Sequence, residues 1–205
     1  MSRRKRTRNP YQKADRFTVR AKEEGFAARS VFKLQEIQRR FRLLAPGMRA
    51  VDLGCAPGSW WKFAAQQVGR RGRVLGVDIA EPEVDCGPLL VRSVLEVTPA
   101  DILEGLEGPP DVVLSDMAPR TTGDAFGDHV RQIELARCAL ALAVATLPEG
   151  GAFVVKVFDG EEAPDFVTDM RRHFGKLKRV KPEAVRQVSR EFFVVAQARR
   201  TPPSG

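Results

Sequence analysis

The sequence has few of the residues that build disulfide frameworks and metal sites. Its three cysteines, Cys55, Cys86 and Cys138, are odd in number and widely spaced, and only two histidines, His129 and His173, are present. Because no two cysteines form a CxxC pair, the pattern fits neither a disulfide framework nor a zinc site. We expect no metal centre, and we expect each histidine to cap or cover a helix.

Long apolar runs are also missing. None approaches the roughly 18–20 residues of a membrane span, and the basic N-terminus is followed by no apolar signal region. We therefore expect a cytoplasmic protein that does not enter a membrane. A length of 205 residues with 43% hydrophobic content fits one compact domain with an appendage. We expect a flexible arm over 1–15, one domain over 16–200 and a loose tail over 201–205.

Acidic residues are lacking at the N-terminus, where basic residues precede the first acid, Asp15. The chain as a whole has a formal net charge of +8 and a sequence pI near 9.9, which is typical of nucleic-acid-binding proteins. Such an arm either solubilises a protein or contacts phosphates, and the arm and the pI together favour contact with RNA or DNA. The basic residues of the arm are Arg3, Arg4, Lys5, Arg6, Arg8 and Lys13.

What remains is a chain in which apolar strands alternate with helices. Such near-continuously apolar strands indicate a mostly parallel sheet covered on both faces, a doubly wound α/β fold with its ligands at the carboxyl ends of the strands. The expected strands are 48–54, 73–79, 88–94, 110–117, 152–158, 176–180 and 191–200. The expected helices are 11–42, 60–68, 129–147 and 164–174, with a loop or short helix at 80–88 and a mobile loop at 118–128.

The stretch VDLGCAPGS (51–59) has the residues of a cofactor-binding turn. Gly54 and Gly58 allow the backbone to approach a ligand, and the helix that follows offers free N–H groups. The next expected strand ends in Asp78, where a carboxylate can accept hydrogen bonds from ribose hydroxyls. Each feature alone fits ordinary turn chemistry, but their order within one βαβ unit favours an adenosine-bearing cofactor. Asp116, at the end of the strand in LSDMAP, lies beside the same crevice or caps a turn.

A lysine stands at the centre of the apolar stretch FVVKVF (153–158). Lysine is almost never fully buried unless it is paired, so Lys156 has two interpretations. Either its ammonium group reaches water at the end of the strand, or the protein holds a lysine of altered proton affinity in a cleft.

Five separated segments resemble the FtsJ/RrmJ-type (RlmE-like) ribosomal RNA 2′-O-methyltransferases. The resemblance spans about residues 11–200, and its specificity comes from the combination of segments. These are RSVFKLQEI (29–37), VDLGCAPGSW (51–60), LSDMAP (114–119), VVKVF (154–158) and SREFFVV (189–195).

The resemblance implies an S-adenosylmethionine-dependent methyltransferase with a Rossmann-like fold, a seven-stranded sheet whose last strand is antiparallel. It implies methylation of the ribose 2′-hydroxyl of a uridine in large-subunit ribosomal RNA. Carried over by position, the catalytic residues are Lys33, Asp116, Lys156 and Glu191, and the cofactor contacts are Gly58, Trp60, Asp78 and Asp116.

One position departs from the family pattern. Family members carry an acid after the third strand, where the adenine amine is recognised, but an ungapped count places Val94 there. Glu96 or Asp101 can replace that acid only if the loop shifts. The identity of the adenine contact is therefore open, although the reaction is not affected.

The proposed chemistry gives the lysines a role. A ribose 2′-hydroxyl is a poor nucleophile, so the enzyme must hold it in line with the methyl group and remove its proton. A neutral lysine can do this, and a second cation nearby favours the neutral form. We expect Lys156 or Lys33 to be the base, with Asp116 and Glu191 orienting the two. On its helix Lys33 points away from the apolar stripe, so it is expected outside the core.

Three other functions compete with ribosomal RNA methylation. A transfer RNA ribose methyltransferase shares the same catalytic residues, and an RNA-binding ribosome-assembly factor with a vestigial site conflicts with the intact set of four. A small-molecule methyltransferase fits poorly with the basic arm. We expect a monomer, and we expect basic residues near the N-terminus to follow phosphates without specificity, namely Arg16, Arg20, Lys22 and Arg29.

Overall fold

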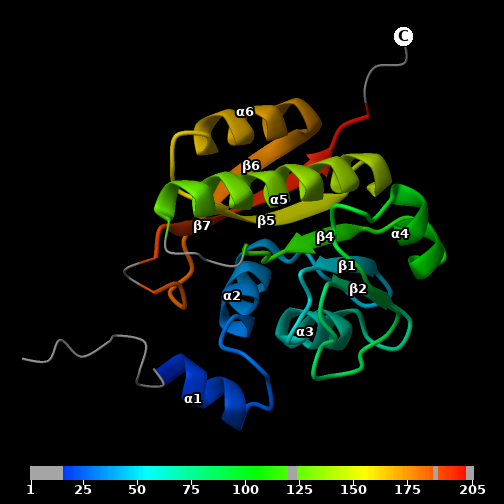
Figure 1. The fold of residues 1–205 in the computed structure, drawn as a ribbon. Coiled ribbons are helices and arrows are strands. Elements are labelled where there is room, and N and C mark those ends of the chain that lie inside the picture. The colour runs from blue at the N-terminus through cyan, green and yellow to red at the C-terminus, as the bar shows by residue number, and fades with distance from the viewer. Residues whose placement is uncertain (1–15, 120–123, 187–188, 202–205) are drawn as a thin grey trace, which may run out of the picture.

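A computed structural model describes residues 16–119, 124–186 and 189–201, and within them the chain forms a seven-stranded sheet (Figure 1). The order of the strands is β3-β2-β1-β4-β5-β7-β6. The expected arm, 1–15, and residues 202–205 of the expected tail lie outside the described residues. The strands are β1 (Arg49–Leu53), β2 (Arg73–Asp78), β3 (Leu89–Val91), β4 (Val112–Ser115), β5 (Ala152–Phe158), β6 (Phe174–Val180) and β7 (Glu191–Arg199).

The sheet is parallel except at one strand. The strands from β3 to β5 pair in parallel, whereas β7 lies between β5 and β6 and is antiparallel to both. This arrangement confirms the expected doubly wound, mostly parallel fold with an antiparallel last strand. It also means that β7 begins at the edge where the parallel strands end.

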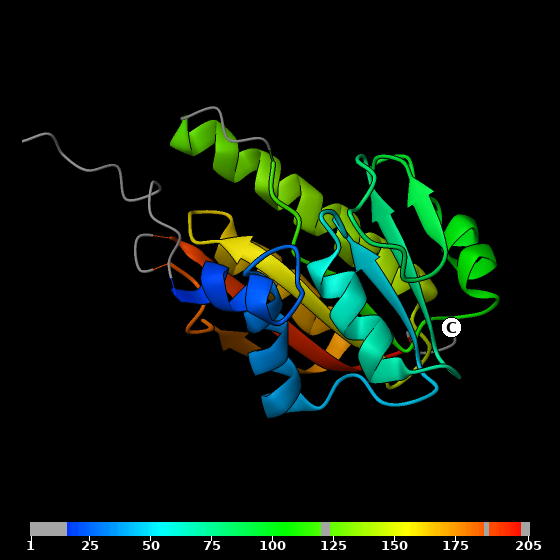
Figure 2. The same cartoon turned by 90° about the horizontal axis from the view of Figure 1, so that it is seen from below.

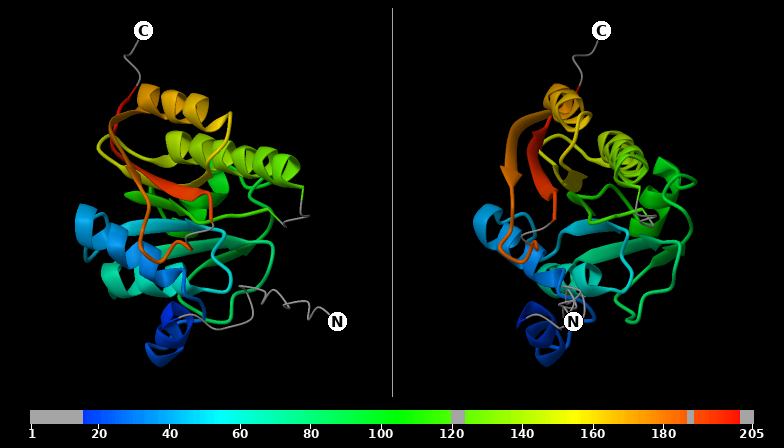
Figure 3. Two further views of the ribbon diagram at one scale, coloured as in Figure 1. Left: turned by 90° about the vertical axis from the view of Figure 1, so that its left-hand side faces the viewer. Right: turned by 60° about the vertical axis from the view of Figure 1, so that its left-hand side comes forward.

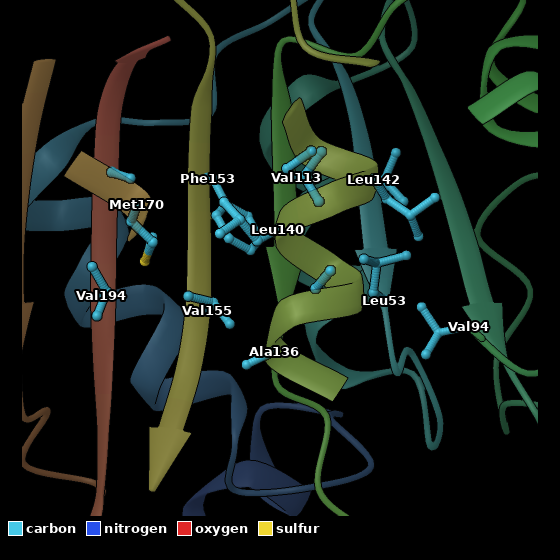
Figure 4. Packing of buried hydrophobic residues seen from close by; sticks show 14 of the residues in the cluster. Leu53, Val94, Val113, Ala136, Leu140, Leu142, Phe153, Val155, Met170 and Val194 are labelled. Carbon is cyan, nitrogen blue, oxygen red and sulfur yellow. The ribbon is translucent and has the colours of Figure 1, made fainter. Parts of the chain in front are cut away.

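Helices cover both faces of the sheet (Figures 1 and 3). One face packs against α4 (Pro99–Leu106), α5 (Ala125–Thr146) and α6 (Ala163–His173). The other packs against α2 (Val31–Phe41) and α3 (Ser59–Val68), with α1 (Arg16–Glu23) beside α2 (Figure 2). Since successive side chains of a strand point to opposite faces, each central strand contributes to both apolar layers. Figure 4 shows the layer beneath α5, with Phe153, Val155 and Leu140 in it.

The expected single helix over 11–42 is wrong, because the chain forms two helices in its described part. α1 ends at Glu23, and Gly25 adopts a left-handed φ of 73°. The amide of Phe26 donates to the carbonyl of Ala21, and that of Gly25 to the carbonyl of Lys22. This is a Schellman stop signal, and it lets α2 begin in a new direction at Val31.

The region between 94 and 110 holds a helix that the sequence analysis missed. Thr98 and Asp101 form a reciprocal capping box at the start of α4, with a proline in the first turn. This Thr-Pro-x-Asp pattern is a start signal for a helix, so α4 could have been predicted from the sequence. The expected loop 118–128 is also shorter than predicted, since α5 begins at Ala125. Its residues 120–123 lie outside the described residues, and the predicted mobility of the loop stays a prediction. Residues 80–88 form a loop, as one of the two alternatives predicted.

None of the helices in the described part of the chain combines the length and apolar character that crossing a bilayer requires.

Phe153 is a sensitive point of the core because it is fully buried and stacks on Phe174 with ring centroids 6.2 Å apart. We expect Phe153→Ala to lower the free energy of unfolding by about 3–5 kcal/mol, through lost burial and the cavity left behind. Urea denaturation measures this loss. Val130→Ala, at a side chain 37% exposed, is the matched control and should change stability by less than about 0.5 kcal/mol. A loss below about 1 kcal/mol for Phe153→Ala would contradict this packing.

Candidate active site

The turn after β1 brings the backbone close to its neighbours. Gly54 has φ 82°, and a Cβ there would lie 2.6 Å from the Cγ of Met117, at the end of β4. Gly58 has φ 112°, and a Cβ there would lie 2.3 Å from a methyl carbon of Val84. Glycine is therefore required at both predicted positions. At Gly58 the close neighbour is a protein side chain.

A pocket of about 400 Å³ opens at the carboxyl ends of β1, β2 and β4, where a doubly wound sheet binds its ligands. Among the described residues that line it, Asp78 and Asp116 are the charged ones, and both are acids. A phosphate-bearing ligand would need cations here, whereas a sulfonium cation and ribose hydroxyls suit carboxylates. The described part of the pocket therefore suits a ligand that carries positive charge and hydroxyl groups.

Asp78 is held in place by two backbone amides. Its Oδ2 accepts from the amide of Ala56 at 2.9 Å and its Oδ1 from the amide of Ala80 at 3.0 Å. A carboxylate has about four acceptor positions, so Asp78 keeps capacity for ligand hydroxyls. Ile79 follows it, lines the same pocket and is 64% exposed. The sequence analysis missed Ile79, although the residue after a strand-end acid was the place to look.

Beyond Asp78, the described pocket wall has Val94 at the position where the family pattern has an acid. Val94 is buried and lines the pocket together with Ser93, a residue that the sequence analysis did not consider. Asp101 does not replace the acid, because its Oδ2 accepts from the amide of Thr98 at 2.8 Å and pairs with Arg92 at 3.1 Å. Neither Glu96 nor Asp101 is among the described residues that line the pocket, whereas Ser93 and Val94 are.

Strand geometry brings the four predicted catalytic residues together. Lys156 shares the α2 face of β5 with Val154, two residues away, and Glu191 shares that face of β7 with Phe193. Asp116 directly follows β4, and Lys33 comes from α2. The Nζ atom of Lys156 lies 3.0 Å from Oδ1 of Asp116 and donates to the carbonyl oxygen of the same residue at 2.6 Å.

Lys33 completes the network from the opposite helix. Its Nζ lies 2.6 Å from Oε1 of Glu191 and 3.7 Å from Oδ1 of Asp116, and it stands 5.5 Å from the ring centroid of Phe193. The expectation that Lys33 lies outside the core needs correction, because only 8% of the residue is exposed. The ammonium group of Lys156 does not reach water at the end of β5 either, since only 5% of this residue is exposed. Both lysines are buried and paired.

The network fixes the charge of two of its members. Burial raises the pKa of Asp116, but the ammonium groups of Lys156 and Lys33 more than offset this and hold the pKa below its ordinary value. Burial likewise lowers the pKa of Lys33, and the carboxylates of Asp116 and Glu191 bring it above the ordinary value. Asp116 is therefore an anion and Lys33 a cation at neutral pH.

The end of β5 depends on a residue that the sequence analysis missed. Pairing between β4 and β5 stops at Val155. Beyond it, the side chain of Gln132 from α5 forms hydrogen bonds with the backbone of β5. Its Nε2 donates to the carbonyl of Lys156 at 2.6 Å, and its Oε1 accepts from the amide of Phe158 at 2.9 Å. Gln132 is 1% exposed, and a buried glutamine at this place in a helix is the signal for such a role.

The side chain of Trp60 packs between α2 and β7, and its predicted contact with the cofactor stays a prediction. Of the described residues, those lining the 400 Å³ pocket include neither Gly58 nor Trp60. The indole N–H of Trp60 donates to the carbonyl of Ser30 at 2.8 Å, and its ring lies 5.7 Å from that of Phe193. It supports the start of α2, and through it the position of Lys33.

Comparison with known proteins decides the family. The family model of the FtsJ-like methyltransferases matches residues 26–199. The chain belongs to the FtsJ-like methyltransferase family. It is 44% identical over 189 residues to the ribosomal RNA large subunit methyltransferase E of Desulfatibacillum aliphaticivorans, covering 91% of each chain. It is 43% identical over 196 residues to the enzyme of the same name from Sorangium cellulosum, covering 94% of this chain and 92% of that one.

Solved structures agree on the fold of this FtsJ-like methyltransferase. A Plasmodium falciparum protein described as a ribosomal RNA methyltransferase superposes with a TM-score of 0.75 at 21% identity, covering 85% of this chain and 98% of that one. A fibrillarin/Nop5p complex gives a TM-score of 0.58 at 19% identity, covering 82% of each chain. The fold is therefore the Rossmann-like methyltransferase fold that the sequence predicted.

Gln132 allows a test of how Lys156 is held. We expect Gln132→Met to lower the free energy of unfolding by about 2–4 kcal/mol, because two buried backbone groups lose their partners. We also expect a fall in kcat for methyl transfer with little change in cofactor affinity, since Lys156 is displaced and the pocket is not. Urea denaturation and steady-state kinetics measure the two effects. Unchanged stability and kcat would show that the side chain does not organise this edge.

Asp52, at the end of β1, is fully buried, and its carboxylate oxygens have no hydrogen-bond partner among the described residues. Burial, followed by the charges of Asp116 and Asp78, raises its pKa well above the ordinary value. Above an ordinary carboxyl pKa of about 4, the folded protein keeps a proton that the unfolded chain has lost. Stability therefore falls as pH rises towards the folded pKa, by up to about 1.4 kcal/mol per pH unit.

Asp52→Asn removes this titration without changing the shape of the side chain. We expect its stability advantage over the wild type to grow as pH rises from 5 towards 8, measured by urea denaturation without cofactor. Glu149→Gln, at an exposed acid, is the control. An advantage that is constant across the range would mean that Asp52 has an ordinary pKa in the folded protein.

Proposed function

We propose that the chain transfers a methyl group from S-adenosylmethionine to the ribose 2′-hydroxyl of a uridine in large-subunit ribosomal RNA. The observation that carries this proposal is the buried network of Lys33, Asp116, Lys156 and Glu191 at the edge of the cofactor pocket. The names of the relatives support ribosomal RNA as the substrate. The choice of uridine and of the 2′-oxygen follows from the sequence resemblance.

The pocket residues suit the proposed cofactor. Asp78 would accept hydrogen bonds from its ribose, Ile79 and Val94 would contact its adenine, and Asp116 would face its positive end. When bound, S-adenosylmethionine supplies a methyl group already activated by a positively charged sulfur. The protein therefore has no need to activate the methyl group, and its task is to prepare the attacking oxygen.

Lys156 is our candidate for the general base. In its neutral form its Nζ would take the proton of the 2′-hydroxyl, and the oxygen would form its new bond to the methyl carbon. Asp116 orients this Nζ from two sides, with its carboxylate and its backbone carbonyl. The carboxylates of Asp116 and Glu191 raise the pKa of Lys33, so Lys33 remains the cation of the network.

Removal of the Lys156 amine tests this function directly. Labelled methyl from S-adenosylmethionine is offered with large ribosomal subunits, naked ribosomal RNA or bulk transfer RNA, and the products are digested to nucleosides. We expect 2′-O-methyluridine from the ribosomal substrate, and a rate about 10²–10⁴-fold lower for Lys156→Met. Lys178→Met, at an exposed lysine on β6, is the control and should keep the wild-type rate.

Other outcomes separate the competing functions. Label in transfer RNA alone would overturn the proposed substrate and leave the chemistry standing. Cofactor binding with no RNA labelled would point to an assembly factor with an inactive site. A Lys156→Met rate equal to that of Lys178→Met would exclude Lys156 as the base.

A further inference from the structure

A second pocket lies on the other side of the ion network. It has a volume of about 300 Å³ and is bordered by Lys33 and Glu191, whereas Asp116 borders the cofactor pocket. The network therefore separates two pockets of different character. The walls of the second pocket come from the segment before α2 and from the segment between β6 and β7, which lie side by side (Figures 1 and 3). Their remaining lining residues are Ala28, Arg29, Ser30, Arg186 and Ser189.

Two guanidinium groups converge on this second pocket. Arg29 is fixed by donating a hydrogen bond to the carbonyl of Ala184, in the same segment as Arg186. Burial lowers the pKa of the Arg29 guanidinium, the charge of Arg186 lowers it further, and Glu191 raises it. The second pocket thus brings the charges of Arg29 and Arg186 within range of each other and of Glu191, whose carboxylate also pairs with Lys33 at 2.6 Å. Such an arrangement is stabilised by an anion that both guanidinium groups can contact.

We propose that Arg29 and Arg186 bind the phosphate on the 3′ side of the methylated ribose. This inference rests on the proposed function. Arginine forks match the oxygens of a phosphate, and in RNA the 3′-phosphate is attached to the carbon next to the one that bears the 2′-hydroxyl. A phosphate held in a pocket bordered by Lys33 would therefore bring that hydroxyl to the ion network. The two arginines are positioning residues, since they orient the nucleotide and take no part in proton transfer.

Salt dependence of RNA binding tests the phosphate contact. The probe is an unmodified large-subunit ribosomal RNA transcript, bound at several salt concentrations by wild type, Arg29→Met, Arg186→Met and the double variant. We expect each single variant to bind about tenfold more weakly. For the double variant, the slope of log K against log salt should fall by about 0.7–0.9, the value of one phosphate. Cofactor affinity should not change.

Arg39→Met is the matched control, because Arg39 is an exposed residue of α2 and does not line the pocket. An unchanged salt slope, or an affinity of the double variant within twofold of this control, would overturn the proposal. If Arg29→Met fails to fold after losing its bond to Ala184, Arg186→Met decides, since Arg186 is exposed.

Whether the bound phosphate lies on the 3′ side of the methylated ribose can be tested once the methylated nucleotide has been located. A neutral methylphosphonate in place of the 3′-phosphate of that nucleotide should weaken RNA binding by the wild type about tenfold. RNA binding by the double variant should not change. An equal loss of affinity in both proteins would contradict the assignment. A failure of the phosphate contact can be distinguished from a failure of the proposed function. Methylation by the wild type with double-variant binding equal to that of the control rejects only the phosphate contact. RNA binding with the predicted slope but no 2′-O-methyl product rejects only the function.

Discussion

Two lysine side chains and two carboxylates share one buried network, and the organisation of the site depends on it. Removing such charges from water is costly, and the cost is offset only when each has a partner of opposite sign at short range. Here Lys33 pairs with Glu191 at 2.6 Å and Lys156 with Asp116 at 3.0 Å. The network joins α2 to β4, β5 and β7, so loss of one member leaves an uncompensated charge inside the protein.

The antiparallel strand explains how an acid reaches this place. Parallel strands deliver their last residues to one edge of the sheet, and this is how Asp116 and Lys156 arrive there. β7 runs the other way, so it delivers its first residue, Glu191, to the same edge. The network then lies between an acidic pocket suited to a sulfonium cofactor and a pocket with two arginines. In the function we propose, methyl donor and acceptor approach from opposite sides.

Much of this site could be predicted from the sequence, because strands impose a strict period. Once β5 and β7 are identified, alternation places Lys156 with Val154 and Glu191 with Phe193 on the same face. The placement of Lys33 could not be predicted in the same way. Helical periodicity puts it off the apolar stripe, but its burial depends on carboxylates more than 80 residues away. Gln132 and Ser93 were missed for the same reason, since their roles come from contacts across the fold.

The errors at the level of the fold have local causes. The stop at Gly25 and the capping box at Thr98 are both written in a few consecutive residues, and both were readable with the capping rules. Trp60 is a different case. The family motif predicts a cofactor contact for it, and the structure adds a role that the motif does not contain, since its indole N–H donates to Ser30 and its ring packs on Phe193.

A crystal structure with S-adenosylhomocysteine bound would show on which side of the network the cofactor lies. We expect the ribose hydroxyls at Asp78, the adenine against Ile79 and Val94, and the sulfur at the end of the pocket nearest Asp116 and Lys156. A ligand whose sulfur points away from Lys156, or which occupies the pocket of Arg29 and Arg186, would contradict this expectation.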